Sequence, residues 1–157
     1  MKILIIVESK HLGNTKKIAD AMAKAAPVDI TDVAGAADYR LDDYDIIGFG
    51  SGIYMGRHDK RLLKFADGLC DKPADCFVFS TSGGSDFEQN NRALVDLLTA
   101  KNKTVLGVFS CRALDKFFVL WLTGGVNKGH PDADDLKNAQ DFICDIIAKQ
   151  QAKVAAQ

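Results

Sequence analysis

Three polar segments of the chain each follow an apolar run directly. They are residues 9–15, 51–57 and 81–87, called here the first, second and third segments, and each contains glycine and at least one hydroxyl side chain. Hydroxyl groups, side-chain amides and the backbone N–H groups of glycine-containing turns bind anions and the polar edges of ring systems. We therefore expect the ligand chemistry of this protein in these three segments.

The first segment has the composition of a phosphate site. Ser9, Gly13, Asn14 and Thr15 precede a stretch of helical periodicity, and the N–H groups at a helix N-terminus favour an anion. Neither GxxxxGK[ST] nor GxGxxG occurs within residues 8–18, so a mononucleotide phosphate is favoured over a triphosphate or a dinucleotide. The alternative is an ordinary helix cap and turn.

Apolar runs of strand type alternate with helical periodicity along the chain. A fully apolar run is typical of a strand buried on both faces of a parallel sheet, and parallel neighbours need a helical crossover. The sequence therefore predicts an α/β fold, a three-layer doubly wound domain over residues 1–157. The predicted strands are residues 3–7, 28–30, 46–50, 76–79 and 105–109.

Four helices are predicted around these strands. The first contains Ile18 and Met22 and ends before Pro27, and the last begins after an N-cap at Asp132 and frays after Lys149. The second and third carry apolar stripes at Leu62, Phe65 and Leu69 and at Leu94, Leu97 and Leu98. Ligands of doubly wound sheets bind beyond the carboxyl ends of the strands, where the three segments must meet.

The three segments together resemble those of the flavodoxin family. The first ends in Gly13-Asn14-Thr15, as the phosphate loop of that family does. The resemblance implies a five-stranded parallel sheet in the order 2-1-3-4-5 and one bound FMN. It further implies that Ser9 and Thr15 donate hydroxyl groups to the phosphate and that Asn14 contributes its amide. His11 stands where many members carry Ser or Thr.

The second and third segments resemble the loops that hold the flavin ring. Tyr54 would stack on the ring and Gly56 would lie near N5, with Gly52 as the alternative, while backbone N–H groups at residues 83–84 would face the pyrimidine edge. Phe87 would be a second aromatic wall. The full set of predicted cofactor contacts is Ser9, His11, Gly13, Asn14, Thr15, Ser51, Gly52, Ile53, Tyr54, Gly56, Thr81, Ser82, Gly83, Gly84 and Phe87.

The resemblance implies an electron carrier that works with redox partner proteins. The alternative is an FMN-dependent reductase or dehydrogenase of a quinone, a porphyrinogen-like compound or another small substrate, with residues 117–122 forming its pocket. Other interpretations of the apolar segment 117–122 are a lid over the cofactor, a dimer surface, a docking edge for a membrane or partner, or extra core. Whether the protein forms a homodimer is left open. A receiver domain of the CheY kind ranks last, because Ser9 and Ser51 stand where acids are needed.

The charge pattern predicts a potential less negative than that of acidic flavodoxins. The formal net charge is −1, and Arg57, His58, Lys60 and Arg61 add positive charge beside the second segment. A cation there stabilises the negative charge that reduction adds. The small net charge also argues against nucleic acid or anionic lipid as partners.

The composition is that of a water-soluble domain. The chain has 157 residues, of which 47% are hydrophobic and 26% charged, and no apolar run long enough for a membrane span or signal peptide. Its four cysteines and three histidines lack metal-ligand spacing, so we expect reduced thiols, no metal and a cytoplasmic location. Cys111 follows a predicted strand near the ligand edge, but a lone thiol is usually structural.

Overall fold

The structure is a computed structural model that describes residues 1–10, 12–113, 127 and 129–156. Its strands are β1 (Ile3–Glu8), β2 (Asp29–Thr31), β3 (Ile46–Tyr54), β4 (Arg57–His58), β5 (Ala74–Ser82) and β6 (Lys103–Arg112). Its α-helices are α1 (Asn14–Ala25), α2 (Lys60–Asp67), α3 (Phe87–Ala100) and α4 (Ala133–Ala155), and two 3₁₀-helices, η1 (Gly35–Asp38) and η2 (Leu41–Asp43), join β2 to β3.

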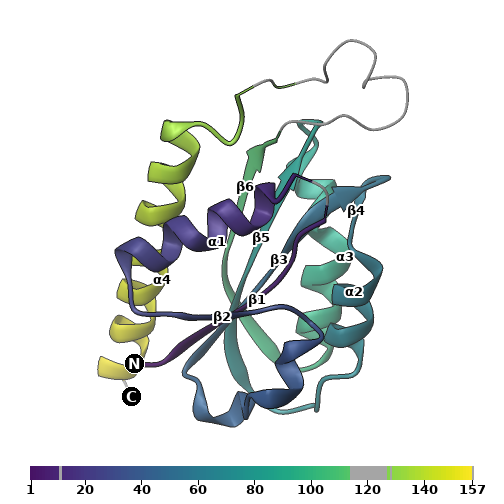
Figure 1. The fold of residues 1–157 in the computed structure, drawn as a ribbon. Coiled ribbons are helices and arrows are strands. Elements are labelled where there is room, and N and C mark those ends of the chain that lie inside the picture. Colours follow the sequence, from purple (N-terminus) through teal and green to yellow (C-terminus); the bar gives the residue numbers. More distant parts are fainter. Residues whose placement is uncertain (11, 114–126, 128, 157) are drawn as a thin grey trace.

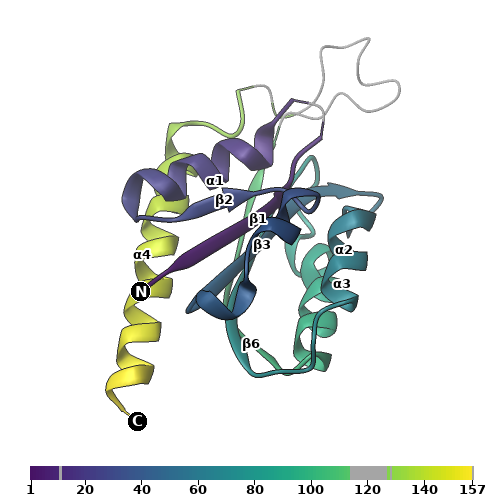
Figure 2. The same ribbon diagram turned by 60° about the horizontal axis from the view of Figure 1, so that its bottom comes forward.

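The sheet has the predicted order. Its path is β2-β1-β3-β5-β6, all parallel, and β4 pairs with β3 in the antiparallel sense. With β4 set aside, this is the order 2-1-3-4-5, so the predicted α/β, three-layer, doubly wound fold is confirmed. The helices α1 and α4 cover one face and α2 and α3 cover the other (Figures 1 and 2).

Each face of the sheet has its own apolar core. Ile18 and Met22 of α1 pack with Ile143 and Ile146 of α4 over one face, and all four are fully buried. Leu62 of α2, with Leu94 and Leu98 of α3, packs over the other face. Every residue of β1 is buried, which is the pattern expected of a central strand that is covered on both sides.

Two glycines of β3 make room for aromatic rings of the neighbouring strand. A Cβ on Gly48 would lie 2.3 Å from the Phe77 ring, and a Cβ on Gly50 would lie 2.1 Å from the Phe79 ring. Both rings are fully buried. The two phenylalanines therefore lie flat against β3 because β3 has no side chain at these positions.

Several predicted boundaries are wrong, in most cases because the strands run further. β3 continues to Tyr54, β5 to Ser82 and β6 to Arg112, so parts of the second and third segments are strand. The helix α4 does not fray after Lys149, since it continues to Ala155. Pairing with a neighbouring strand holds residues that look like loop in the sequence in extended conformation.

The N-terminus of α4 matches its prediction. Asp132 is the N-cap, and its side chain accepts hydrogen bonds from the backbone N–H groups of Asp134 and Asp135. Both ends of the described chain lie at the end of the sheet opposite the three segments (Figure 1). In the described residues no helix is both long and apolar enough to cross a membrane. Residues 117–122 lie outside the described residues.

Candidate functional site

The register of the sheet brings the three segments to one edge. Glu8 at the end of β1 pairs with Ser51 of β3, Gly52 pairs with Thr81 of β5, and Thr81 pairs with Cys111 of β6. These are the carboxyl ends of the central strands, where doubly wound folds bind their ligands. The segments that the sequence singled out are therefore neighbours in space.

The first segment leads into the N-terminus of α1. Gly13 is the N-cap residue of α1 with a φ of 68° and, being glycine, makes no side-chain hydrogen bond to the helix. The backbone N–H of Lys16 donates to Ser9 Oγ at 3.2 Å, while Asn14 and Thr15 are buried. His11, also a predicted contact, lies outside the described residues.

A side-chain hydrogen bond joins the first segment to the third. Thr15 Oγ1 and Thr81 Oγ1 lie 2.8 Å apart and are buried. This bond fixes the start of α1 against the end of β5. Two polar side chains that are 66 positions apart in the sequence are thereby in contact.

The donors at the start of α1 fit a phosphate group. The first turn of the helix contains no acidic residue, and no described atom lies within 4 Å of a Cβ placed on Gly13. The space beside Gly13, the N-terminus of α1 and the nearby hydroxyls of Ser9 and Thr15 together give hydrogen-bonding groups that suit an anion.

The second segment is a β-hairpin rather than a loop. β3 and β4 are joined by Met55 and Gly56, whose φ angles of 52° and 76° are both positive. Two positive φ angles are typical of the tight type I′ turn, which matches the twist of the strands. Glycine takes such an angle without strain, whereas Met55 takes it at some cost and is 96% exposed.

Tyr54 folds back over the strand that carries it. Its hydroxyl oxygen lies 2.9 Å from the position of a Cβ on Gly52, so a side chain at Gly52 would displace the Tyr54 hydroxyl. Ile53, on the alternate face, pairs with His58 of β4. Tyr54 and Ile53 are both half-buried, and Lys10 Nζ lies over the Tyr54 ring, 5.7 Å from its centroid.

Ser51 and His58 begin a buried chain of hydrogen bonds. Ser51 Oγ lies 2.8 Å from both His58 Nδ1 and the Gly52 carbonyl oxygen, and it accepts the N–H of Asp59 at 3.0 Å. His58 Nε2 lies 2.9 Å from Asn91 Oδ1 of α3. The Ser51 hydroxyl thus has partners in the interior of the protein, and its contact with a cofactor stays a prediction.

The tautomer of His58 follows from its partner. The Asn91 amide nitrogen donates to the Phe87 carbonyl oxygen and to Ser110 Oγ, so Asn91 Oδ1 is left as an acceptor. His58 therefore carries a hydrogen on Nε2 and donates it to Asn91 Oδ1. Burial lowers the pKa of His58 to about 4, against the smaller opposing effect of the Asn91 hydrogen bond.

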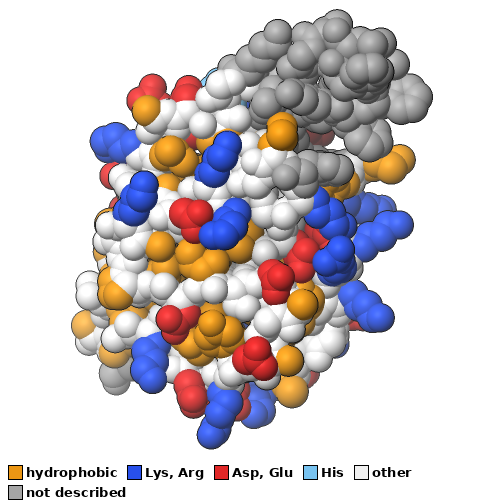
Figure 3. Space-filling model, in the orientation of Figure 1, with side chains coloured by type: hydrophobic (Ala, Val, Ile, Leu, Met, Phe, Trp, Pro, Cys, Tyr) orange, Lys and Arg blue, Asp and Glu red, His pale blue; other side chains and the backbone are white. Residues whose placement is uncertain are grey.

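The neutral state of His58 corrects one sequence prediction. With its pKa near 4, the ring is uncharged at neutral pH, and the residue is 2% exposed. The expectation that His58 adds positive charge beside the second segment is wrong. Arg57, Lys60 and Arg61 are exposed, and Figure 3 shows basic side chains gathered on the side of the molecule where β4 and α2 lie.

Two ion pairs with buried carboxylates cross this edge. Lys10 Nζ lies 2.5 Å from Asp59 Oδ2, and Arg61 lies 3.6 Å from Glu8 Oε2. The Asp59 and Glu8 side chains are only 1% and 6% exposed. Burial alone would raise the pKa of Asp59, but the hydrogen bonds from Lys10 and from the backbone N–H of Arg61 lower it below its ordinary value.

The third segment is held by its own side chains and by residue 127. Ser82 Oγ accepts the backbone N–H of Gly84 at 3.1 Å, and Asn127 donates to the Gly83 carbonyl oxygen at 2.8 Å. Gly84 is exposed. Phe87 is half-buried at the first position of α3.

Cys111 of β6 is buried, and burial raises the pKa of its thiol to about 12. The thiol is therefore no thiolate nucleophile.

A separate cavity lies away from the three segments. It has a volume of about 1060 Å³ and is lined by the connection from β2 to β3, by α2 and by the first residues of β5. Phe49, Phe65 and Leu69 form part of its apolar lining, and Lys64 and Lys72 are among its charged residues. None of the predicted cofactor contacts lines it.

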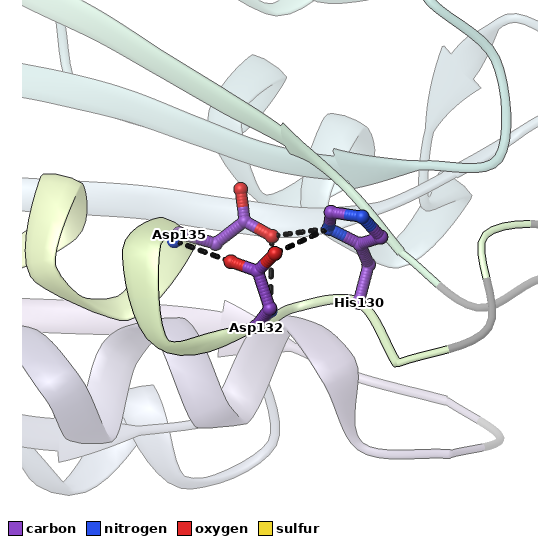
Figure 4. A group of neighbouring side chains, drawn as sticks. All are labelled: His130, Asp132 and Asp135. Carbon is purple, nitrogen blue, oxygen red and sulfur yellow. Dashed lines mark hydrogen bonds and ion pairs between the residues drawn. The ribbon is translucent and has the colours of Figure 1, made fainter.

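His130, Asp132 and Asp135 form a group at the start of α4 (Figure 4). His130 Nδ1 lies 2.6 Å from Asp135 Oδ2, which also accepts the backbone N–H of Asp132. The carboxylates thus complete a capping box, with Asp132 accepting N–H groups of the first turn. The cap explains this geometry without an ion. The hydrogen bond that His130 donates to Asp135 raises the pKa of His130.

Sequence reasoning missed the charged and buried polar parts of this edge. Glu8 was read as the end of an apolar run, and Lys10 and Asp59 were not singled out. Asp59 could have been found as an N-cap, because it directly precedes the apolar stripe of α2. The partnership of His58 with Asn91 spans 33 positions and has no local signal.

Comparison with known proteins identifies the family. Residues 4–111 match a family model described as a flavodoxin domain. The chain is 38% identical to an uncharacterized protein of Methanocaldococcus jannaschii over 148 residues, which cover 94% of this chain and 99% of that protein.

Two solved structures illustrate the similarity in fold. Oxidised flavodoxin 2 from Bacillus cereus has a TM-score of 0.70 and 18% identity, over 95% of this chain and 99% of that one. A flavoprotein from Lactobacillus acidophilus in complex with FMN has a TM-score of 0.58 and 16% identity, over 69% of this chain and 92% of that one. The family match over most of the sheet confirms the resemblance: the chain belongs to the flavodoxin-domain family and is a flavodoxin-like flavoprotein with FMN as its cofactor.

Proposed function

We propose that this protein is an electron carrier that holds FMN at the carboxyl edge of its sheet and exchanges electrons with partner proteins. The observation that carries the proposal is the junction of the three segments at that edge, made by the strand register and by the bond between Thr15 and Thr81. Hydrogen-bonding groups and the aromatic side chain of Tyr54 lie on the same edge. This combination suits a phosphate joined to a planar ring system.

Each end of the cofactor has its own set of residues in this proposal. Ser9, Gly13, Asn14 and Thr15 hold the phosphate at the N-terminus of α1, where the helix dipole favours an anion. Tyr54 stacks on the ring. The remaining ring contacts are Gly52, Ile53, Gly56, Thr81, Ser82, Gly83, Gly84 and Phe87. The bound FMN supplies the electron chemistry, and the chain binds, orients and tunes it.

The titratable groups of this edge favour a carrier over an enzyme with acid–base chemistry. Among the described residues, Glu8 and Asp59 are held in ion pairs, His58 is buried and neutral, and Cys111 has a raised pKa. General acid–base catalysis needs a group with an accessible proton and a pKa near the working pH. Neither His58 nor Cys111 combines the two properties.

The charge of the adjoining surface favours an acidic redox partner. Arg57 and Lys60 are exposed beside the hairpin, and Figure 3 shows basic side chains on that side. Complementary charge raises association rates and depends on salt. We therefore expect electron transfer to an acidic partner to slow as the ionic strength rises.

The deciding experiment is anaerobic stepwise reduction of the purified protein after loading with FMN, followed by its visible spectrum. Accumulation of the spectrum of one-electron-reduced flavin supports the carrier. Direct two-electron bleaching, together with steady turnover of a quinone or a porphyrinogen-like compound without a partner protein, supports the reductase or dehydrogenase instead. Failure of the protein to bind FMN would reject both functions.

A further inference from the structure

We propose that the ion pair of Lys10 and Asp59 sets the reduction potential of the bound flavin, by holding two opposite charges in balance beside the ring. This inference rests on the proposed function. It concerns residues that lie in or directly after the segments of the site but that are not among its predicted contacts. Lys10 belongs to the first segment, and Asp59 follows the hairpin formed by the second.

The pair is a built contact rather than a chance meeting of surface charges. The two groups are 2.5 Å apart, and the Asp59 side chain is 1% exposed. Asp59 Oδ1 also accepts the backbone N–H of Arg61 at 2.8 Å, so the carboxylate is the N-cap of α2. A carboxylate fixed in this way cannot turn away when its partner is removed.

The contact with Tyr54 places the pair close to the ring site. Lys10 Nζ lies 5.7 Å from the centroid of the Tyr54 ring. Stacked or edge-on aromatic rings have centroids about 4.5–7 Å apart. A flavin ring that stacks on Tyr54 therefore lies within about 13 Å of the ammonium group, whichever face of the tyrosine it occupies.

Burial makes the two charges unequal in strength. The Lys10 side chain is 41% exposed, whereas that of Asp59 is almost fully enclosed. Water screens the lysine more than the aspartate, because a buried charge acts through a lower dielectric. Loss of Asp59 should therefore shift the potential more than loss of Lys10 does, and in the opposite direction.

The sign of each shift follows from the charge that remains. Reduction adds negative charge to the flavin, which a nearby carboxylate disfavours and a nearby ammonium favours. Lys10→Met leaves Asp59 alone and lowers the potential. Asp59→Asn leaves Lys10 alone and raises it, while an asparagine keeps the cap of α2. The double variant removes both charges and restores a potential close to that of the original protein.

The experiment measures both one-electron midpoint potentials of the FMN-loaded protein and its three variants at pH 8, where an unpaired Asp59 stays ionised. The matched controls are Lys137→Met and Asp141→Asn, which break an exposed ion pair of the same 2.5 Å length on α4. We expect Lys10→Met to lower the second potential by at least 59 mV, a tenfold change in the one-electron equilibrium. Asp59→Asn should raise it by more, and the controls should not move it.

Affinities for FMN and riboflavin distinguish the competing outcomes. Lys10→Met should change both affinities by the same factor. A loss of FMN affinity alone would make Lys10 a phosphate ligand and overturn the inference, as would shifts of the same sign in the two single variants. Binding of neither flavin by the original protein would instead reject the proposed function, a result that is separate from any comparison of variants.

Discussion

His58 Nε2 and Asn91 Oδ1 lie 2.9 Å apart in the interior and join β4 to α3. Asn91 also reaches Ser110 Oγ at 2.8 Å, and Ser110 lies 2.8 Å from Ser80 Oγ. The hairpin that carries Tyr54 is thereby tied to α3, β6 and β5 by one line of buried and half-buried polar groups. Such a network is stable only while every member has its partner.

His58 makes the stability of the protein depend on pH below neutrality. Its pKa is about 4 when folded and about 6.5 when unfolded, so the unfolded chain binds more protons between these values. Stability is therefore lost as the pH falls from about 6.5 toward 4, by about 2 kcal/mol at pH 5.

The measurement for His58 is urea unfolding at pH 7 and pH 5 with a fixed FMN concentration. The comparison is with His58→Gln, which lacks the titrating ring and should lose about 2 kcal/mol less over this range. Equal losses in the two proteins would show that His58 is not buried in its neutral form.

His130 has the opposite pH dependence. The hydrogen bond to Asp135 raises its pKa in the folded state, so the charged ring adds stability that is fully present below the unfolded pKa of about 6.5. This contribution is lost as the pH rises through the raised folded pKa. A histidine proton titration by NMR should place the His130 pKa above 6.5, and His130→Gln should flatten thermal stability against pH in that window. A pKa below 6.5 would contradict the contact in Figure 4.

Gly50→Ala should destabilise the protein although alanine is the better residue in most strands. Its Cβ would meet the Phe79 ring at 2.1 Å, and overpacking of this kind costs about 1–3 kcal/mol. Gly68→Ala is the matched control, because Gly68 has a φ of −78° and its Cβ would make only ordinary contacts. Gly68→Ala should leave the free energy of unfolding, measured in urea, unchanged or raise it by up to about 1 kcal/mol. A neutral Gly50→Ala would show that the Phe79 ring can move.

Thr15→Val tests the proposed phosphate site. The substitution keeps the shape of the side chain but removes the hydroxyl that meets Thr81 Oγ1. If Thr15 serves the phosphate, FMN affinity should fall about tenfold, the effect of one lost charge-assisted hydrogen bond of about 1.4 kcal/mol, while riboflavin affinity stays unchanged. Thr104→Val, at an exposed position of β6, is the control. Equal losses for FMN and riboflavin would place the effect on packing.

The fold was predictable because its signals are local. The apolar run of β1 and the cap at Asp132 each follow from a few neighbouring residues, and parallel order follows from the alternation of strands and helices. The β3–β4 hairpin was missed because its turn is Met55-Gly56, whereas the sequences that announce such turns are Asn-Gly and Asp-Gly.

The candidate site was predictable in outline but not in its electrostatics. His58 stands among basic residues and was read with them, yet alternation along β4 turns it inward while Arg57 faces solvent. The pairing of Lys10 with Asp59 joins residues 49 positions apart. Contacts of this kind depend on which strands are neighbours, and no short window of sequence contains that information.

The position of the chain ends determines which edge of the sheet faces the solution when the protein is attached to an electrode. The helix α4 ends at Ala155, at the end of the sheet remote from the hairpin of Tyr54 (Figure 1). A tether attached beyond α4 would leave the carboxyl edge facing the solution, open to diffusing partners. Immobilisation through the basic side chains near β4 would instead turn that edge toward the support and shorten the path for electrons.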